Sequence, residues 1–182
     1  MEDLSLHILD IAENSVEARA RQVDIRIEEN RRQGRLILLI SDDGQGMSRE
    51  LRAQALDPFV TTKGRRRVGL GLSLLAQAAE AAGGALSIRS RPGRGTRIRA
   101  AFLLSHIDLK PLGDIAQTLV TLIVGYPHVD FRLAYKAGGR KYVFDTGDLR
   151  AQLGGLPLTT SPAIALIKKD ITDGINETRR YL

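Results

Sequence analysis

SDDGQGMSRE, residues 41–50, directly follows the apolar run RLILLI, and the interpretation of the whole chain depends on it. It places a pair of aspartates, the first of them Asp42, and two glycines, Gly44 and Gly46, where a buried strand is expected to end. A tight turn requires only one glycine or an Asp–Gly pair. The pattern fits a strand-to-helix loop with Ser48 as N-cap, and it also fits a backbone that must approach a ligand closely.

The composition is that of a folded protein. The 182 residues are 43% hydrophobic and 26% charged, enough for one domain or one domain with a small appendage. The chain has no cysteine and its three histidines are scattered, so it predicts no disulfide, cysteine nucleophile or histidine metal cluster. The N-terminus lacks a signal-peptide pattern, and the apolar runs are shorter than the ~20 residues of a membrane span. We therefore expect a cytoplasmic protein without a membrane partner.

The positive charge is concentrated in one part of the chain. The net charge is +6, and the segment 63–99 contains nine Lys or Arg residues but a single acid, Glu80. Beside glycine-rich loops, such an excess favours a phosphate-bearing small ligand at least as well as a nucleic acid. The chain has four Tyr, four Phe and no Trp, and none of them interleaves with the basic run. Because base stacking needs such aromatic residues, nucleic acid is the least favoured partner.

The hydrophobic periodicity predicts alternating helices and strands in the first part of the chain. The expected helices lie at residues 4–20, capped by Asp3 or Ser5, at 48–56 and at 72–84. The expected strands lie at 22–29, 35–41, 85–90 and 96–104. The strand at 35–41 is apolar on both faces, which is typical of a central strand.

The character of the sequence changes at about residue 105. The later part predicts a helix that begins near Pro111 and ends just before Pro127, a hairpin over 129–146 across two glycines, and short helices at 147–153 and 161–181. We therefore expect two units, residues 1–104 and residues 105–182. The second is a small α+β appendage that could serve for docking or dimerisation.

Five short motifs fall on the expected elements in a fixed order, and together they carry more information than any of them alone. They are Asp10 and Asn14 one turn apart on a helix; D-x-G-x-G at Asp42, Gly44 and Gly46; D-P-F-x-T-T-K from Asp57 to Lys63; G-x-G-L at Gly69 to Leu72; and G-x-G-T at Gly93, Gly95 and Thr96.

This set resembles the GHKL ATPase superfamily of gyrase, heat-shock chaperones, histidine kinases and MutL. ENSVEARA is similar to the MutL-type motif, whereas DPFVTTKG and GLGLSL are more similar to histidine kinases. The resemblance covers residues 1–104 and implies the Bergerat fold, an α+β sandwich with a mixed sheet and helices on one face. It also implies ATP and Mg²⁺ as ligands, with ATP held between a helix and a lid. The whole chain resembles small stand-alone ATP-binding proteins.

The chemistry of the residues agrees with a role in adenine recognition. Asp42 can accept the exocyclic amine of adenine, and an acceptor at this place rejects the carbonyl of guanine. Gly44 and Gly46 allow the backbone to approach the base. The resemblance gives Thr96 a place in a water-bridged network around the base, whereas strand propensity alone would explain it as a β-branched strand residue.

The helix face that carries Asp10 and Asn14 is expected at the phosphates. Asn14 can supply a neutral oxygen to Mg²⁺, and in the family the position of Asp10 orients or deprotonates the attacking nucleophile. A solvated helix face is the structural alternative. Most relatives carry Glu or His at this position, and the shorter Asp10 puts turnover in doubt. Glu13 points about 100° away around the helix and cannot substitute for it.

The remaining expected contacts are with phosphate groups. Amides at a helix N-terminus favour an anion, and basic side chains in the preceding lid can pair with it, although a solvated loop would also explain them. The residues expected there are Lys63, Arg65, Gly69, Leu70, Gly71 and Leu72.

Three classes of function follow. The first is a Mg-ATP-binding protein that phosphorylates or regulates a partner protein through lid closure, with weak or partner-dependent activity. The second is a non-catalytic ATP- or ADP-sensing subunit of a larger complex, and the third is nucleic-acid binding. We expect no phosphoacceptor hairpin before residue 1, a structural role for His7, and a possible homodimer.

Overall fold

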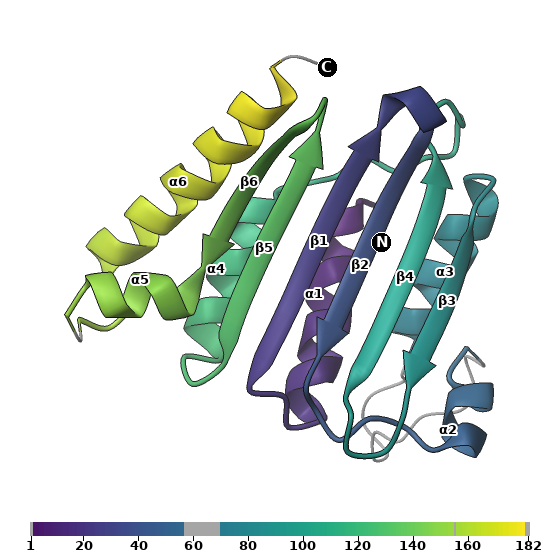
Figure 1. The fold of residues 1–182 in the computed structure, drawn as a ribbon, viewed down its shortest axis with the longest axis horizontal. Helices are drawn as coiled ribbons and strands as arrows, with labels where there is room; N and C mark the ends of the chain where they lie inside the picture. The colour runs from purple at the N-terminus through teal and green to yellow at the C-terminus, as the bar shows by residue number, and fades with distance from the viewer. Residues whose placement is uncertain (1, 57–69, 155, 181–182) are drawn as a thin grey trace.

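A computed structural model describes residues 2–56, 70–154 and 156–180. Its strands form a six-stranded mixed sheet in the order β3-β4-β2-β1-β5-β6 (Figure 1). The strands are β1 (Gln22–Asn30), β2 (Arg35–Asp42), β3 (Ala85–Ser90), β4 (Thr96–Leu103), β5 (Asp130–Ala137) and β6 (Arg140–Asp145). The helices are α1 (Leu4–Glu17), α2 (Arg49–Gln54), α3 (Gly71–Ala81), α4 (Ile115–Gly125), α5 (Thr146–Gln152) and α6 (Ser161–Arg179), with the 3-10 turn η1 (Arg31–Gln33).

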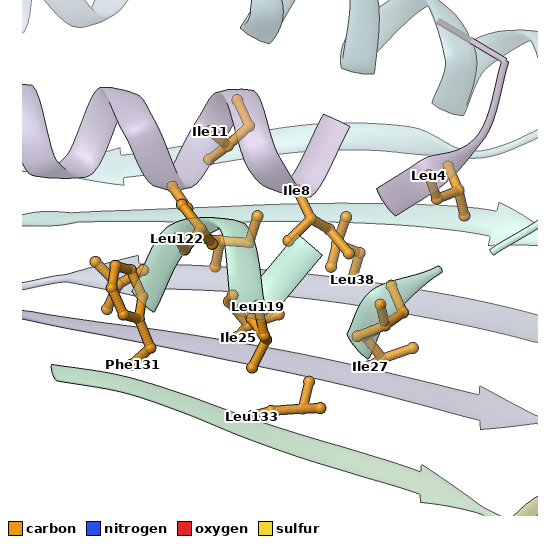
Figure 2. Close-up of a cluster of buried hydrophobic side chains, with 14 of the residues drawn as sticks. Leu4, Ile8, Ile11, Ile25, Ile27, Leu38, Leu119, Leu122, Phe131 and Leu133 are labelled. Carbon is orange, nitrogen blue, oxygen red and sulfur yellow. The ribbon is translucent and has the colours of Figure 1, made fainter. Parts of the chain in front are cut away.

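The core lies between one face of the sheet and the helices. In Figure 1 the sheet lies in front of α1, α3 and α4. Figure 2 shows Ile8 and Ile11 of α1 above side chains of the sheet such as Ile25, with Leu119 of α4 beside them. All four of these side chains are fully buried. The mixed α+β fold with helices on one face of the sheet is confirmed.

The strand β2 is predicted to be buried on both faces, but only one of its faces is fully buried. The strand is central, as expected, and Leu36, Leu38 and Ile40 are buried under the helices. Ile37 and Leu39 point the other way and are only half-buried. The apolar pattern on both faces therefore does not correspond to two covered faces among the described residues.

Local capping sets the ends of the helices. Asp3 is the cap of α1, accepting a hydrogen bond from the Leu6 amide at 3.0 Å. Ser48 caps α2 as expected, accepting from the Leu51 amide. α4 begins at Ile115, later than predicted, because Gly113 has a left-handed backbone (φ +77°) and Asp114 caps the helix.

The sheet runs across the predicted boundary at residue 105. β5 pairs in parallel with β1, so that Ile25 lies beside Leu133, and β6 extends the sheet beyond β5. The helix α6 packs against α4, β5 and β6. Strands from both predicted units therefore share one sheet, whereas the docking or dimerisation role of residues 105–182 stays a prediction.

Candidate functional site

Asp42 connects two of the sequence motifs and the helix α1. It stands at the end of β2, half-buried, and its Oδ1 accepts hydrogen bonds from the amides of Gly44 (2.9 Å) and Thr96 (3.1 Å). Its Oδ2 accepts a hydrogen bond of 2.9 Å from the hydroxyl of Ser15. The carboxylate is thus held by α1, by its own loop and by the start of β4. These contacts fix its direction before any ligand binds.

The neighbouring Asp43 has a different role. Its Oδ1 accepts hydrogen bonds from the amides of Arg21 (2.8 Å) and Gln22 (2.9 Å), where the chain enters β1. Asp43 therefore holds the loop after β2 against the start of β1, and it leaves Asp42 as the carboxylate of the candidate site.

The glycines of this region allow the loops to pack against each other. A Cβ on Gly44 would lie 2.7 Å from the Ala18 carbonyl oxygen, and one on Gly46 (φ +67°) would lie 2.0 Å from the Arg91 carbonyl oxygen. These distances are too short for a side chain. The glycines bring the loop after β2 against the end of α1 and against the β3–β4 turn, and their approach to a base stays a prediction.

Hydroxyl groups join the loop after β2 to the β3–β4 hairpin. The Met47 amide donates to Ser90 Oγ at 2.7 Å, and Ser90 Oγ lies 2.9 Å from Thr96 Oγ1. The Gly93 amide donates to the Gln45 carbonyl at 2.7 Å. Thr96 is therefore part of a polar network beside Asp42, and its contact with a base stays a prediction.

Asp10 lies against the N-terminus of α3. A Cβ on Gly71 would stand 1.8 Å from Oδ2 of Asp10. Asp10 and Asn14 are both half-buried on the same side of α1. The structure thus brings Asp10 to the glycine that opens α3. The phosphate site expected there stays a prediction.

Only some of the residues predicted to contact phosphate, those at the N-terminus of α3, lie in the described part of the chain. Leu70 is the exposed N-cap residue, without a side-chain cap, and Leu72 is half-buried in the first turn. Lys63, Arg65 and Gly69 lie outside the described residues, as does the whole D-P-F-x-T-T-K motif from Asp57.

His7 is a buried structural residue. Its side chain is 1% exposed, and neither ring nitrogen has a hydrogen-bond partner among the described residues. Burial lowers the pKa of His7 to about 4; the Lys110 ammonium acts in the same direction, and the Asp3 carboxylate opposes it. A neutral imidazole so enclosed is not placed to accept a phosphoryl group.

Searches of the described residues for a metal site and for a membrane-spanning helix both find none. Within the described ranges, no group of three or more His, Cys, Asp or Glu side chains could hold a metal ion. A Mg²⁺ ion at Asn14 would therefore depend on phosphate oxygens and water, as this ion usually does. A search of the same ranges finds no helix long and apolar enough to cross a membrane.

The sequence model of the family described as histidine kinase-, DNA gyrase B- and HSP90-like ATPase matches residues 2–106, more than half of the chain. The chain belongs to this ATPase family. The match includes Asp10, Asn14, Asp42, Gly71 and Thr96 and supports ATP as the ligand of the site.

The curated relatives that resemble this ATPase-family chain are much longer than it is. It is 38% identical over 76 residues to the nitrogen regulation protein NtrY of Azorhizobium caulinodans, covering 41% of this chain and 10% of NtrY. It is 36% identical over 112 residues to the sensor protein kinase FleS of Pseudomonas aeruginosa, covering 60% of this chain and 27% of FleS. The chain thus spans a small part of these relatives.

A solved structure matches nearly the whole chain. The N-terminal domain of a DNA repair protein superimposes with a TM-score of 0.56 at 16% identity, covering 96% of this chain and 57% of the other. At this identity the likeness concerns the fold alone. It spans both the family match and the strands β5 and β6.

Proposed function

We propose that this chain binds Mg-ATP and acts on, or regulates, a partner protein, with weak or partner-dependent phosphoryl transfer or ATP hydrolysis. The observation that carries the proposal is the fixed carboxylate of Asp42, held by Ser15, Gly44 and Thr96. Membership in the ATPase family supports ATP as the ligand. The action on a partner protein is our inference.

Adenine recognition falls to one oxygen of Asp42. Oδ1 already accepts two backbone amides, whereas among the described residues Oδ2 accepts only the hydroxyl of Ser15. A carboxylate oxygen has two lone pairs, so Oδ2 retains acceptor capacity for the exocyclic amine of adenine. Guanine presents a carbonyl at that position and would meet an acceptor. Ser15 thereby acts as a positioning residue for Asp42.

The phosphates would lie between α1 and the N-terminus of α3. The opening amides of α3 favour negative charge, and Asn14 would contribute a neutral oxygen to Mg²⁺, which neutralises charge on phosphate oxygens. The carboxylate of Asp10 is placed at the same helix end, beside Gly71. In this role Asp10 would accept a proton from the attacking hydroxyl or water at one of its carboxylate oxygens.

The second candidate is an ATP- or ADP-sensing subunit without turnover. It is favoured by the length of Asp10, which is one methylene shorter than the glutamate usual at this position of the family. Lid closure belongs to both candidates as a proposal, because the lid residues 57–69 lie outside the described ranges.

Calorimetric titration with ATP and Mg²⁺, followed by an assay of ADP in the same sample, separates the two candidates. Turnover that is lost in Asp10→Asn with ATP affinity retained supports the first. Binding without ADP formation, unchanged in Asp10→Asn and in the presence of candidate protein substrates, supports the second. No ATP binding at all would contradict both.

A further inference from the structure

Four arginines lie together on the face of the sheet that no described helix covers. In Figure 1 no helix is drawn across the near face of the sheet, and α1, α3 and α4 lie behind it. Strand alternation points Arg89 of β3, Arg97 and Arg99 of β4 and Arg26 of β1 to this face. All four are exposed. These four residues are called the arginine face below.

The strand register brings the four arginines close together. Arg89 lies directly opposite Arg97, and Arg99 is separated from Arg26 only by Leu39 on the strand between them. Neighbouring strands are about 4.8 Å apart and alternate residues along a strand about 6.8 Å apart. The α-carbons of the arginine face therefore fit within a patch about 16 Å across, the distance from Arg89 on β3 to Arg26 on β1.

The four arginines of the arginine face form no ion pair with the acids on their side of the sheet among the described residues. The nearest acids on this side of the sheet are Asp24 and Glu28 of β1, which lie two residues before and after Arg26. Asp24 accepts a hydrogen bond from the Gln22 side chain at 3.3 Å, and Glu28 pairs with Lys136 at 3.2 Å. Farther away, Asp145 of β6 pairs with Arg132 at 3.8 Å. The side chains of the four arginines make no hydrogen bond or ion pair with any residue of 2–56, 70–154 or 156–180. Like charges directly opposite each other destabilise a sheet. A binding partner of opposite charge would neutralise this repulsion.

The surroundings favour a protein partner over a nucleic acid. Arginine binds carboxylates and phosphates alike through paired N–H groups. Here, however, the half-buried Leu39 lies between Arg99 and Arg26, with the half-buried Ile37 next to it on β2. No aromatic side chain points outward on this face from the described strands, so bases would find no stacking surface.

The spacing suggests the form of the partner. Arg99 and Arg26, two strand spacings apart, are about 10 Å from each other, with an apolar side chain between them. On a helix, residues i and i+7 are also about 10 Å apart, with i+3 or i+4 between them on the same side. A helix is also the usual second layer on an uncovered sheet. We propose that the arginine face binds an acidic amphipathic helix of a partner protein, with apolar residues between its carboxylates.

A second copy of the chain fits this surface less well. A two-fold dimer places the same patch on both sides of the interface, and the arginine face would then meet itself. The inference takes from the proposed function only the idea of a partner protein. Binding at the arginine face itself needs no nucleotide.

The probe is a labelled helical peptide of about 20 residues, rich in alanine, with Glu at every seventh position and Leu three residues after each. The control peptide has Gln in place of Glu. Fluorescence anisotropy compares the full chain with the triple variant Arg89→Gln, Arg97→Gln, Arg99→Gln. A second triple variant, Arg32→Gln, Arg49→Gln, Arg180→Gln, removes the same charge elsewhere.

We expect the Glu peptide to bind the unmodified chain and the second variant with affinities within about two-fold of each other. Its affinity for the first variant should be at least about ten-fold lower. The Gln peptide should not bind. In NMR spectra the Arg97 and Arg99 Nε–H signals should shift on titration.

Equal weakening in both variants, or no binding of the Glu peptide, would overturn the proposal. So would binding of duplex or single-stranded DNA, but not of the peptide, through these arginines, or a dimer abolished by the first variant. ATP titration of all proteins is run in parallel. Peptide binding without ATP binding would contradict the proposed nucleotide site and leave this inference standing.

Discussion

Gly71 and Asp10 lie so close that a β-carbon on the glycine would stand 1.8 Å from Oδ2 of the aspartate. The first residue of α3 must therefore lack a side chain if the carboxylate of α1 is to keep its place. This contact joins two motifs that are 61 positions apart in the sequence (71 − 10). Residue 71 therefore has a steric reason to be glycine, in addition to the role proposed for its amide at the phosphates.

We predict that Gly71→Ala displaces either the Asp10 carboxylate or the start of α3. The substitution should destabilise the fold by on the order of 1–3 kcal/mol, because the short aspartate side chain cannot move far. In the double variant Gly71→Ala, Asp10→Ala the clash is gone. Denaturation of both single variants and the double variant gives the coupling energy. Simple additivity of the two changes would contradict the observed contact.

Two glycines of the β3–β4 turn offer a matched comparison. Gly93 and Gly95 have nearly the same left-handed backbone, with φ of +69° and +70°. A Cβ on Gly93 meets nothing within 4 Å, whereas one on Gly95 would lie 1.9 Å from the Asp42 carbonyl oxygen. Gly93→Ala should lower stability by about 1 kcal/mol and leave ATP affinity unchanged. Gly95→Ala should lower stability further and weaken ATP binding, measured by calorimetry. Equal effects at both positions would be inconsistent with a steric role for Gly95.

A buried acid on β1 is expected to hold α6. Glu29 is 7% exposed, accepts a hydrogen bond from the hydroxyl of the fully buried Tyr135, and pairs with Arg179 of α6 at 2.9 Å. Burial and this carboxylate raise the pKa of Tyr135, so the phenol stays a donor.

Glu29→Ala would leave the Tyr135 hydroxyl buried without its acceptor and should lower the free energy of unfolding by about 3 kcal/mol. Its neighbour Glu28 is the control, because its pair with Lys136 lies exposed on the other face. Glu28→Ala should change stability by less than about 1 kcal/mol. Urea denaturation measures both, and a similar effect of the two changes would argue against a buried anchor.

The stability of the chain should depend on pH through His7. The pKa of His7 in the folded chain is about 4, against 6.5 for an unperturbed histidine. Between these values the unfolded chain binds a proton that the folded chain does not. The free energy of unfolding therefore falls as the pH drops from about 6.5 to about 4, by up to about 3 kcal/mol.

The variant His7→Leu should lose this dependence while keeping the dependence due to other groups. Urea denaturation at several pH values between 4 and 7 compares the two proteins. An unchanged pH slope in His7→Leu would mean that other groups cause it.

The sequence predicted the local parts of the fold well, because capping and periodicity are local properties. The cap at Ser48, the strand that ends at Asp42 and the polar face with Asp10 and Asn14 all follow from spacing alone. The start of α4 was misplaced because the residue that stops the helix, Gly113, acts through its backbone conformation.

Long-range pairings could not be predicted from such patterns. The parallel pairing of β1 with β5 and the contact of Glu29 with Arg179 join residues far apart in the sequence. Ser15 was also missed, although one clue was present. It continues the buried stripe of Ile8 and Ile11, and a hydroxyl on such a stripe needs a partner. That partner is Asp42.

The central claim is that Asp42 reads the adenine of ATP, and Asp42→Asn tests it with little disturbance of the fold. The oxygen of the asparagine can still accept from Gly44 and Thr96, and its amide can donate to Ser15, whose hydroxyl can donate instead to the Ile11 carbonyl at 3.2 Å. Its NH₂ group would then face the amine of adenine, donor against donor.

Calorimetric titration of both proteins with ATP and Mg²⁺ is the most direct measurement, with thermal unfolding as the control for folding. We predict an ATP affinity on the order of 100-fold lower for Asp42→Asn, with an unfolding temperature close to that of the unmodified chain. An affinity within about two-fold of the unmodified chain would contradict the assignment of Asp42 and, with it, the proposed nucleotide site.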